Sequence, residues 1–165
     1  MNPGPTKKQP SFSLNRKDGP LEELVRDTNK KTLAIWATDC AERVLPYFEE
    51  NYPDDPRPRD ALTALRAWIV TGVFRMADIR GASLASHAAA RQVGKDTPAR
   101  SAARAAGQSV ATAHVPAHSL GAAIYAQQAV WRAADHREAE SAVAGERDWQ
   151  YRHLLELQEK KSDTG

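Results

Sequence analysis

The stretch SAARAAGQSVATAHVPAHSLGAAIYA, residues 101–126, is dominated by alanine, with glycine and serine at several of the remaining positions. Alanine has the highest helix propensity of the amino acids but little side chain to bury. A helix of this composition stabilises a core only where a neighbouring helix lies close to it. The alanine bias extends over residues 82–134, which predicts closely apposed helices with the four tryptophans as the bulky side chains of the core.

Helical periodicity is clearest upstream, where Leu33, Trp36, Cys40 and Val44 recur at spacings of three and four. Pro46 lies inside this pattern and predicts a kink or a break, because proline removes a backbone donor. Further helices are expected from Pro20, from about residue 59, over about 75–93 and 98–114, from Pro116, and over about 138–158. No segment alternates apolar and polar residues as a strand does. The predicted fold class is all-α, a compact bundle of about six to seven helices with small-residue (Ala-rich) helix packing.

The length of 165 residues suggests one domain. The first residues are polar and proline-rich, and the last are charged and lack periodicity. We therefore expect a flexible N-terminal arm over 1–19, a single helical domain over 20–158 and a disordered tail over 159–165.

Composition limits the classes of function. The formal net charge of +2 is nearly balanced, so it argues against nucleic acid as a partner. The single cysteine, Cys40, excludes an intrachain disulfide and a cysteine-based zinc cluster. No apolar run reaches the roughly 18 residues of a membrane span. These features favour a cytoplasmic, bacterial-type protein with no cofactor and no membrane partner.

Three histidines form the sharpest metal-like pattern. His114 and His118 are four residues apart, a spacing that can bind one ion from a helix face, but Pro116 separates them. As an alternative function, they and His87 would serve a helical metal-dependent enzyme, with Asp39 or a glutamate as a further ligand. The structural interpretation is that His114 bonds carbonyl groups at a helix end and His118 bonds across the corner.

The helix expected over 75–93 has two candidate inner stripes. One consists of small and apolar residues, including Met76, Ile79 and Ser86. The other consists of Arg80, Leu84, His87 and Arg91. A third hypothesis, nucleic-acid binding, would use a basic edge of Arg91, Lys95, Arg100 and Arg104, and the balanced net charge argues against it.

Proline and charge meet in the segment DDPRPRD, residues 54–60. Pro58 biases Arg57 towards an extended conformation, and Asp60 or Asp55 is expected to cap the helix that follows. Arg57 and Arg59 should point to different sides and form ion pairs with carboxylates such as Asp39, Glu42 or Asp55, which would hold two helices together.

The same corner is also a candidate partner-binding loop, because loops on rigid scaffolds commonly meet partners. The two interpretations are compatible. The residues expected to contact a partner are Glu42, Glu49, Glu50, Tyr52, Asp54, Asp55, Arg57 and Arg59.

The block WATDCAERVLPYFEENYPDDPRPRDALTALRAW, residues 36–68, resembles the signature of the type five-like immunity proteins of bacterial polymorphic toxin systems. HAAAR (87–91), AARAAG (102–107), ATAHVPAH (111–118) and AAIYA (122–126) are similar to the remaining blocks, so the resemblance covers about residues 32–130. It implies an all-α protein, without catalytic residues, that binds and neutralises a cognate toxin. We therefore predict an immunity protein and not an enzyme.

Overall fold

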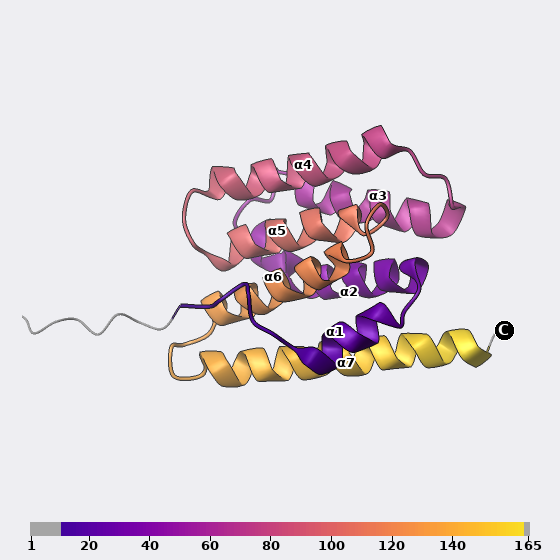
Figure 1. Cartoon of the computed structure of the whole chain (residues 1–165). Coiled ribbons are helices and arrows are strands. Elements are labelled where there is room, and N and C mark those ends of the chain that lie inside the picture. The colour runs from indigo at the N-terminus through magenta and orange to yellow at the C-terminus, as the bar shows by residue number, and fades with distance from the viewer. Residues whose placement is uncertain (1–10, 164–165) are drawn as a thin grey trace, which may run out of the picture.

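Seven helices make up most of the part of the chain that the computed structural model describes, residues 11–163 (Figure 1). They are α1 (Gly19–Arg26), α2 (Lys30–Glu49), α3 (Arg57–Thr71), α4 (Met76–Val93), α5 (Pro98–Ala111), α6 (His118–Ala133) and α7 (Ala139–Asp163). Within these residues there is no strand, and none of the helices is long and apolar enough to cross a membrane. The all-α prediction and the expected number of helices are confirmed.

Helix α5 lies at the centre of the bundle and contacts α2, α3, α4 and α6. Its small side chains are buried, with Ala102, Ala103 and Ala106 fully inaccessible to solvent. Two serines of α4 reach the α5 backbone: Ser86 Oγ donates to the Ala103 carbonyl at 2.7 Å, and Ser83 Oγ donates to the Gly107 carbonyl at 2.9 Å. The alanine-rich stretch therefore forms a rod around which larger helices pack closely.

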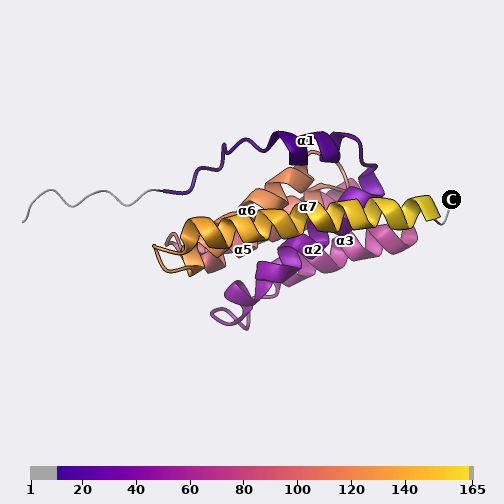
Figure 2. The same cartoon turned by 90° about the horizontal axis from the view of Figure 1, so that it is seen from below.

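A polar network joins α7 to the core. Trp36, which is fully buried on α2, donates from Nε1 to the Gln150 carbonyl at 2.9 Å. The Gln150 side chain accepts from Gln127 Nε2 at 2.8 Å and donates to the Ala123 carbonyl at 3.0 Å, which ties α7 to α6. Cys40 is fully buried in the same cluster as Trp36, and burial raises the pKa of its thiol. Figure 2 shows α7 running along the bundle, with α1 beside it.

Helix ends follow the sequence signals in most places. The Thr97 hydroxyl accepts from the Arg100 amide at the start of α5, with Pro98 in the first turn, and Pro20 lies in the first turn of α1. Pro46 does not end its helix, since α2 continues to Glu49. The proline stands in the last turn of α2, so only one hydrogen bond is lost before the helix ends.

Contacts and helix extend beyond the expected domain of 20–158 at both ends of the described chain. Residues 1–10 of the expected arm lie outside the described residues. Further along the arm, the Phe12 ring packs near the Trp131 ring, with 6.0 Å between the ring centroids, and Arg16 pairs with Glu140 at 3.0 Å. Helix α7 continues to Asp163, beyond the expected end at 158. No glycine or proline interrupts residues 158–163, and basic residues in the last turn interact favourably with the helix dipole.

Candidate interaction site

Arg59 connects α2 to α3 through two carboxylates. Its guanidinium contacts Glu49 at 2.5 and 3.1 Å and Glu42 at 2.6 Å, and Glu42 also pairs with Arg66 at 3.2 Å. Burial alone would raise the pKa of Glu42, but the hydrogen bonds and charges of Arg59 and Arg66 outweigh it and lower that pKa. The prediction that ion pairs hold this corner together is confirmed.

Arg57 binds different partners, as predicted. Its guanidinium donates to both carboxylate oxygens of Asp55 at 2.9 and 2.7 Å and to Gln92 Oε1, at the end of α4, at 2.7 Å. These hydrogen bonds lower the pKa of Asp55. The expected extended conformation of Arg57 is wrong, because Arg57 is the first residue of α3. Asp55 accepts from the Arg57 amide at 3.1 Å, which stabilises the helix start two residues earlier than predicted.

The remaining corner predictions divide into engaged and exposed side chains. Of the three carboxylates considered as arginine partners, Glu42 and Asp55 are used, whereas the Asp39 carboxylate binds His153 Nε2 at 2.7 Å. Glu50, Tyr52 and Asp54 are exposed, and the Tyr52 ring stacks on Phe48 with its centroid at 5.1 Å. The other five predicted contact residues, Glu42, Glu49, Asp55, Arg57 and Arg59, are occupied by one another.

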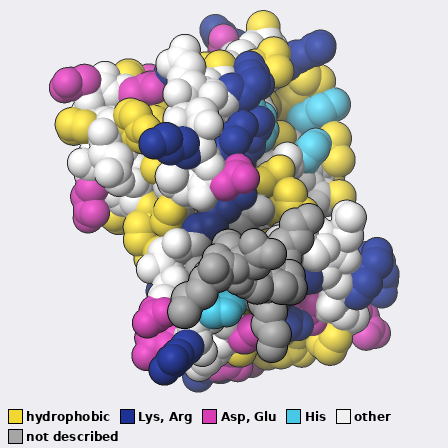
Figure 3. Space-filling model, turned by 90° about the vertical axis from the view of Figure 1, so that its left-hand side faces the viewer, with side chains coloured by type: hydrophobic (Ala, Val, Ile, Leu, Met, Phe, Trp, Pro, Cys, Tyr) yellow, Lys and Arg dark blue, Asp and Glu magenta, His cyan; other side chains and the backbone are white. Residues whose placement is uncertain are grey.

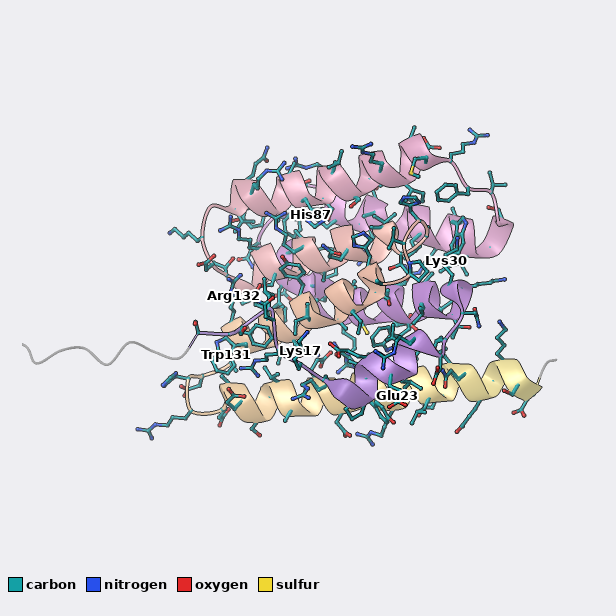
Figure 4. The ribbon with its side chains drawn as sticks, viewed as in Figure 1. Lys17, Glu23, Lys30, His87, Trp131 and Arg132 are labelled. Atoms are coloured by element: carbon teal, nitrogen blue, oxygen red, sulfur yellow. The ribbon has the colours of Figure 1, made fainter. Side chains whose placement is uncertain are left out.

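His87 lies between α4 and α5 (Figure 4). Its Nδ1 accepts from Arg104 Nη1 at 2.9 Å, so the neutral ring carries its proton on Nε2. Burial, together with the positive charges of Arg104 and Arg91, lowers the pKa of His87 to about 4. The ring is against Gly107, where an added Cβ would stand 2.7 Å from Nε2. His87 is therefore a neutral packing and acceptor group.

His114 and His118 lie together at the corner between α5 and α6. His118 Nδ1 bonds Gln108 Oε1 at 2.7 Å, as the structural interpretation predicted, and burial lowers the pKa of His118. His114 stacks on the Phe74 ring at 6.2 Å, whereas the carbonyl bonds expected for it are not formed within residues 11–163. In the same part of the chain, no three His, Cys, Asp or Glu side chains are grouped as metal ligands.

Only one of the two stripes predicted to face inward from α4 does so. Ile79, Ser86 and Ala90 are buried against the bundle, but Arg80, Leu84 and Arg91 are exposed, and Leu84 shows 56% of its surface. The prediction that the second stripe is buried is wrong for Arg80, Leu84 and Arg91, whereas its fourth member, His87, is half-buried against α5. Because α5 offers a surface of alanine, serine and glycine, the small-residue stripe of α4 packs there and the larger side chains remain outside.

A family model described as "Imm-5 like putative immunity protein" matches residues 23–157. The chain belongs to this family. The match to the Imm-5 like family extends past both ends of the resemblance seen in the sequence and includes most of α7. No curated protein and no solved structure matches the chain. The matched region contains the corner between α2 and α3 and the whole of α4.

Proposed function

We propose that this chain is an immunity protein that binds a cognate bacterial toxin domain in the cytoplasm and neutralises it by covering a surface the toxin needs. The observation that carries the proposal is the Imm-5 like match over residues 23–157. The fold supports it, because closely packed helices with hydrogen-bonded corners present preformed surfaces and lose little conformational entropy on binding. Neutralisation by binding needs neither a cofactor nor a catalytic group.

The turn between α2 and α3 is one contact we propose for the toxin. Arg57 and Arg59 fix its two sides, while Glu50, Tyr52 and Asp54 project from it into solvent. An exposed aromatic ring that is already stacked, as Tyr52 is on Phe48, can act as a binding anchor at low entropic cost. The neighbouring carboxylates would then contribute mainly to the rate of association.

The function is tested by co-expressing this chain with each candidate toxin domain found among the products of neighbouring genes and measuring growth of the host cells. Protection, together with a stoichiometric complex between the purified chain and an inactivated toxin domain, is the expected result. Growth arrest despite full expression of the folded chain, with no complex formed, would refute the proposal.

The turn is tested separately with Asp54→Lys and Tyr52→Ala. We expect Asp54→Lys to slow association and Tyr52→Ala to speed dissociation, each by several-fold. Glu23→Lys is the matched control, because Glu23 is exposed on α1, which lies on the far side of the bundle from α4 (Figure 4). If both turn variants bind as the control does while the unaltered chain still protects cells, the turn is not part of the interface.

A further inference from the structure

Charge is divided unevenly between the helices. Residues 76–133, which contain α4, α5 and α6, carry six Lys or Arg and only two carboxylates, Asp78 and Asp96. This segment has a net charge of +4, against +2 for the whole chain, so the remainder of the chain is net negative. The six cationic residues are Arg80, Arg91, Lys95, Arg100, Arg104 and Arg132.

Five of the six cations, all but Arg80, lie at the end of the bundle where α4 ends and α5 begins, and they are only partly neutralised. Figure 3 shows Lys and Arg side chains grouped over the upper half of this end. Asp96 pairs with Arg100 at 3.2 Å and with Arg132 at 3.3 Å, but within residues 11–163 neither Arg80 nor Arg91 pairs with a carboxylate. Burial, with the positive charges of Arg91 and Arg100, lowers the pKa of Arg104, which indicates that like charges lie close together.

The outer stripe of α4 joins this basic end to an apolar region. We call Met76, Arg80, Leu84 and Arg91 the α4 face; their helical spacing places them on one side over about 22 Å. Met76 and Leu84 are 42% and 56% exposed. Most of the exposed large hydrophobic residues in the described part of the chain lie around the N-terminal half of α4, away from Arg91. They are Val70, Val73, Phe74, Met76, Leu84 and Val115. Such a concentration is typical of a binding surface.

A hollow of about 300 Å³ lies at the apolar end of the α4 face. Met76 and Leu84 form one side of it, and His114 and His118 form the other. Arg80 is also part of its wall, so a cation stands beside an apolar depression. A side chain of the size of leucine or phenylalanine fits this space. A carboxylate on the same segment of the partner would pair with Arg80 beside it.

We propose that the α4 face is the principal surface by which this chain holds its toxin, and that it binds an acidic toxin surface from which an apolar side chain enters the hollow. This inference rests on the proposed function. Charge complementarity sets the partner: uncompensated arginines attract carboxylates, and the hollow supplies the buried contact that slows dissociation.

The α2–α3 turn lies next to this surface, because Arg57 bonds Gln92 in the last turn of α4. Its exposed carboxylates, Glu50 and Asp54, belong to the segment that this hydrogen bond attaches to the end of α4. A toxin that places its acidic patch on the α4 face and a basic region on the turn matches both charges. Displacement of the acidic patch towards the turn would bring like charges together, so the turn helps to fix the register in which the toxin binds.

The test uses, in inactivated form, the toxin domain against which the unaltered chain protects cells, and it measures binding of that domain to Arg80→Glu/Arg91→Glu and to Leu84→Asp. The matched control is Arg26→Glu/Arg137→Glu, which changes net charge equally at two exposed arginines without ion pairs in the described residues. We expect the α4 charge reversal to lower the association rate at least about tenfold, in a salt-dependent manner, and Leu84→Asp to raise the dissociation rate by a similar factor. The control should remain within about twofold. Leu84→Ala provides a milder variant should Leu84→Asp fold poorly.

The outcomes separate this inference from the proposed function. If the unaltered chain binds the toxin and all α4 variants bind equally well, the toxin uses another surface and the inference is wrong, while the function stands. If the unaltered chain neither binds nor protects, the proposed function fails and the inference with it. If the α4 charge reversal instead abolishes binding to a short DNA or RNA duplex and leaves toxin binding unchanged, the surface serves nucleic acid and the inference is overturned.

Discussion

At the scale of single residues, Gly107 allows the close contact between α4 and α5. A Cβ there would stand 2.7 Å from His87 Nε2, whereas one at Gly81 would meet no heavy atom within 4 Å. We expect Gly107→Ala to displace His87 and to lower the free energy of unfolding by about 1–2 kcal/mol. Gly81→Ala should raise it by about 0.5–1 kcal/mol, since alanine is the better helix former. Urea unfolding measures both; equal stability of the two variants would contradict the steric argument.

His87 also makes stability depend on pH. Its pKa falls from 6.5 to about 4 on folding, so the unfolded chain takes up the proton first as pH decreases. The stabilisation by the neutral ring is complete above about pH 6.5 and is lost as pH falls through about 4. A glutamine at position 87 would still accept a hydrogen bond from Arg104, but it has no group that takes up a proton in this pH range. Between pH 7 and 4.5, the wild-type chain should therefore lose on the order of 1 kcal/mol more than His87→Gln, allowing for solvent screening. Parallel pH profiles in denaturant titrations would disprove this role.

At the scale of elements, Arg59 fixes α3 against α2 by contacting Glu49 and Glu42 together. Lysine keeps the charge but cannot reproduce the forked contact. We expect Arg59→Lys to lower the free energy of unfolding by about 1 kcal/mol, and 1 M salt to reduce that difference. Arg66→Lys is the control, because Arg66 makes one longer contact of 3.2 Å to Glu42. If Arg59→Lys lowers the free energy of unfolding only as much as Arg66→Lys does, the simultaneous contact of Arg59 with Glu49 and Glu42 adds no stability to the packing of α3 on α2.

At the scale of the whole molecule, α7 is held to the bundle by polar groups as well as by apolar contacts. Gln150 is fully buried and bonded to Gln127 and to the Ala123 carbonyl. Gln150→Leu leaves the Gln127 amide without its partner and should cost about 2 kcal/mol. The double variant Gln127→Leu/Gln150→Leu removes both polar groups and should be more stable than the single variant. Thermal unfolding of the two proteins distinguishes this result from simple addition of two losses.

The sequence determines which residues share a helix face, and less often which face turns inward. The spacing of Leu33, Trp36, Cys40 and Val44 identified the buried side of α2, and all four are at most 1% exposed. The same reasoning failed for Arg80 and Arg91, because the deciding factor was the small-residue surface of α5, which is a property of the neighbour. Long-range pairs such as Asp39 with His153 depend on the packed arrangement of helices far apart in sequence, and no local pattern reveals them.

The candidate site divides in the same way. Ion pairing of Arg57 and Arg59 was predictable, because proline fixes the corner and carboxylates lie within a few residues or one helix turn of it. The α4 face was not predictable from the sequence. A stripe of two arginines, a leucine and a histidine can face either solvent or the core, and only the neighbouring helices decide which. The α4 face becomes a candidate binding surface only when its exposure, its charge and the adjoining hollow are considered together.

The position of Cys40 has a practical consequence. Its sulfur is enclosed between α2 and the helices that α7 covers, so an alkylating reagent can reach it only after these elements separate. Modification of this native thiol, followed by mass spectrometry, would time the opening of the bundle without any introduced label. Comparing the rate of Cys40 modification with and without bound toxin would show whether toxin binding at a distant face also slows opening of the helix bundle.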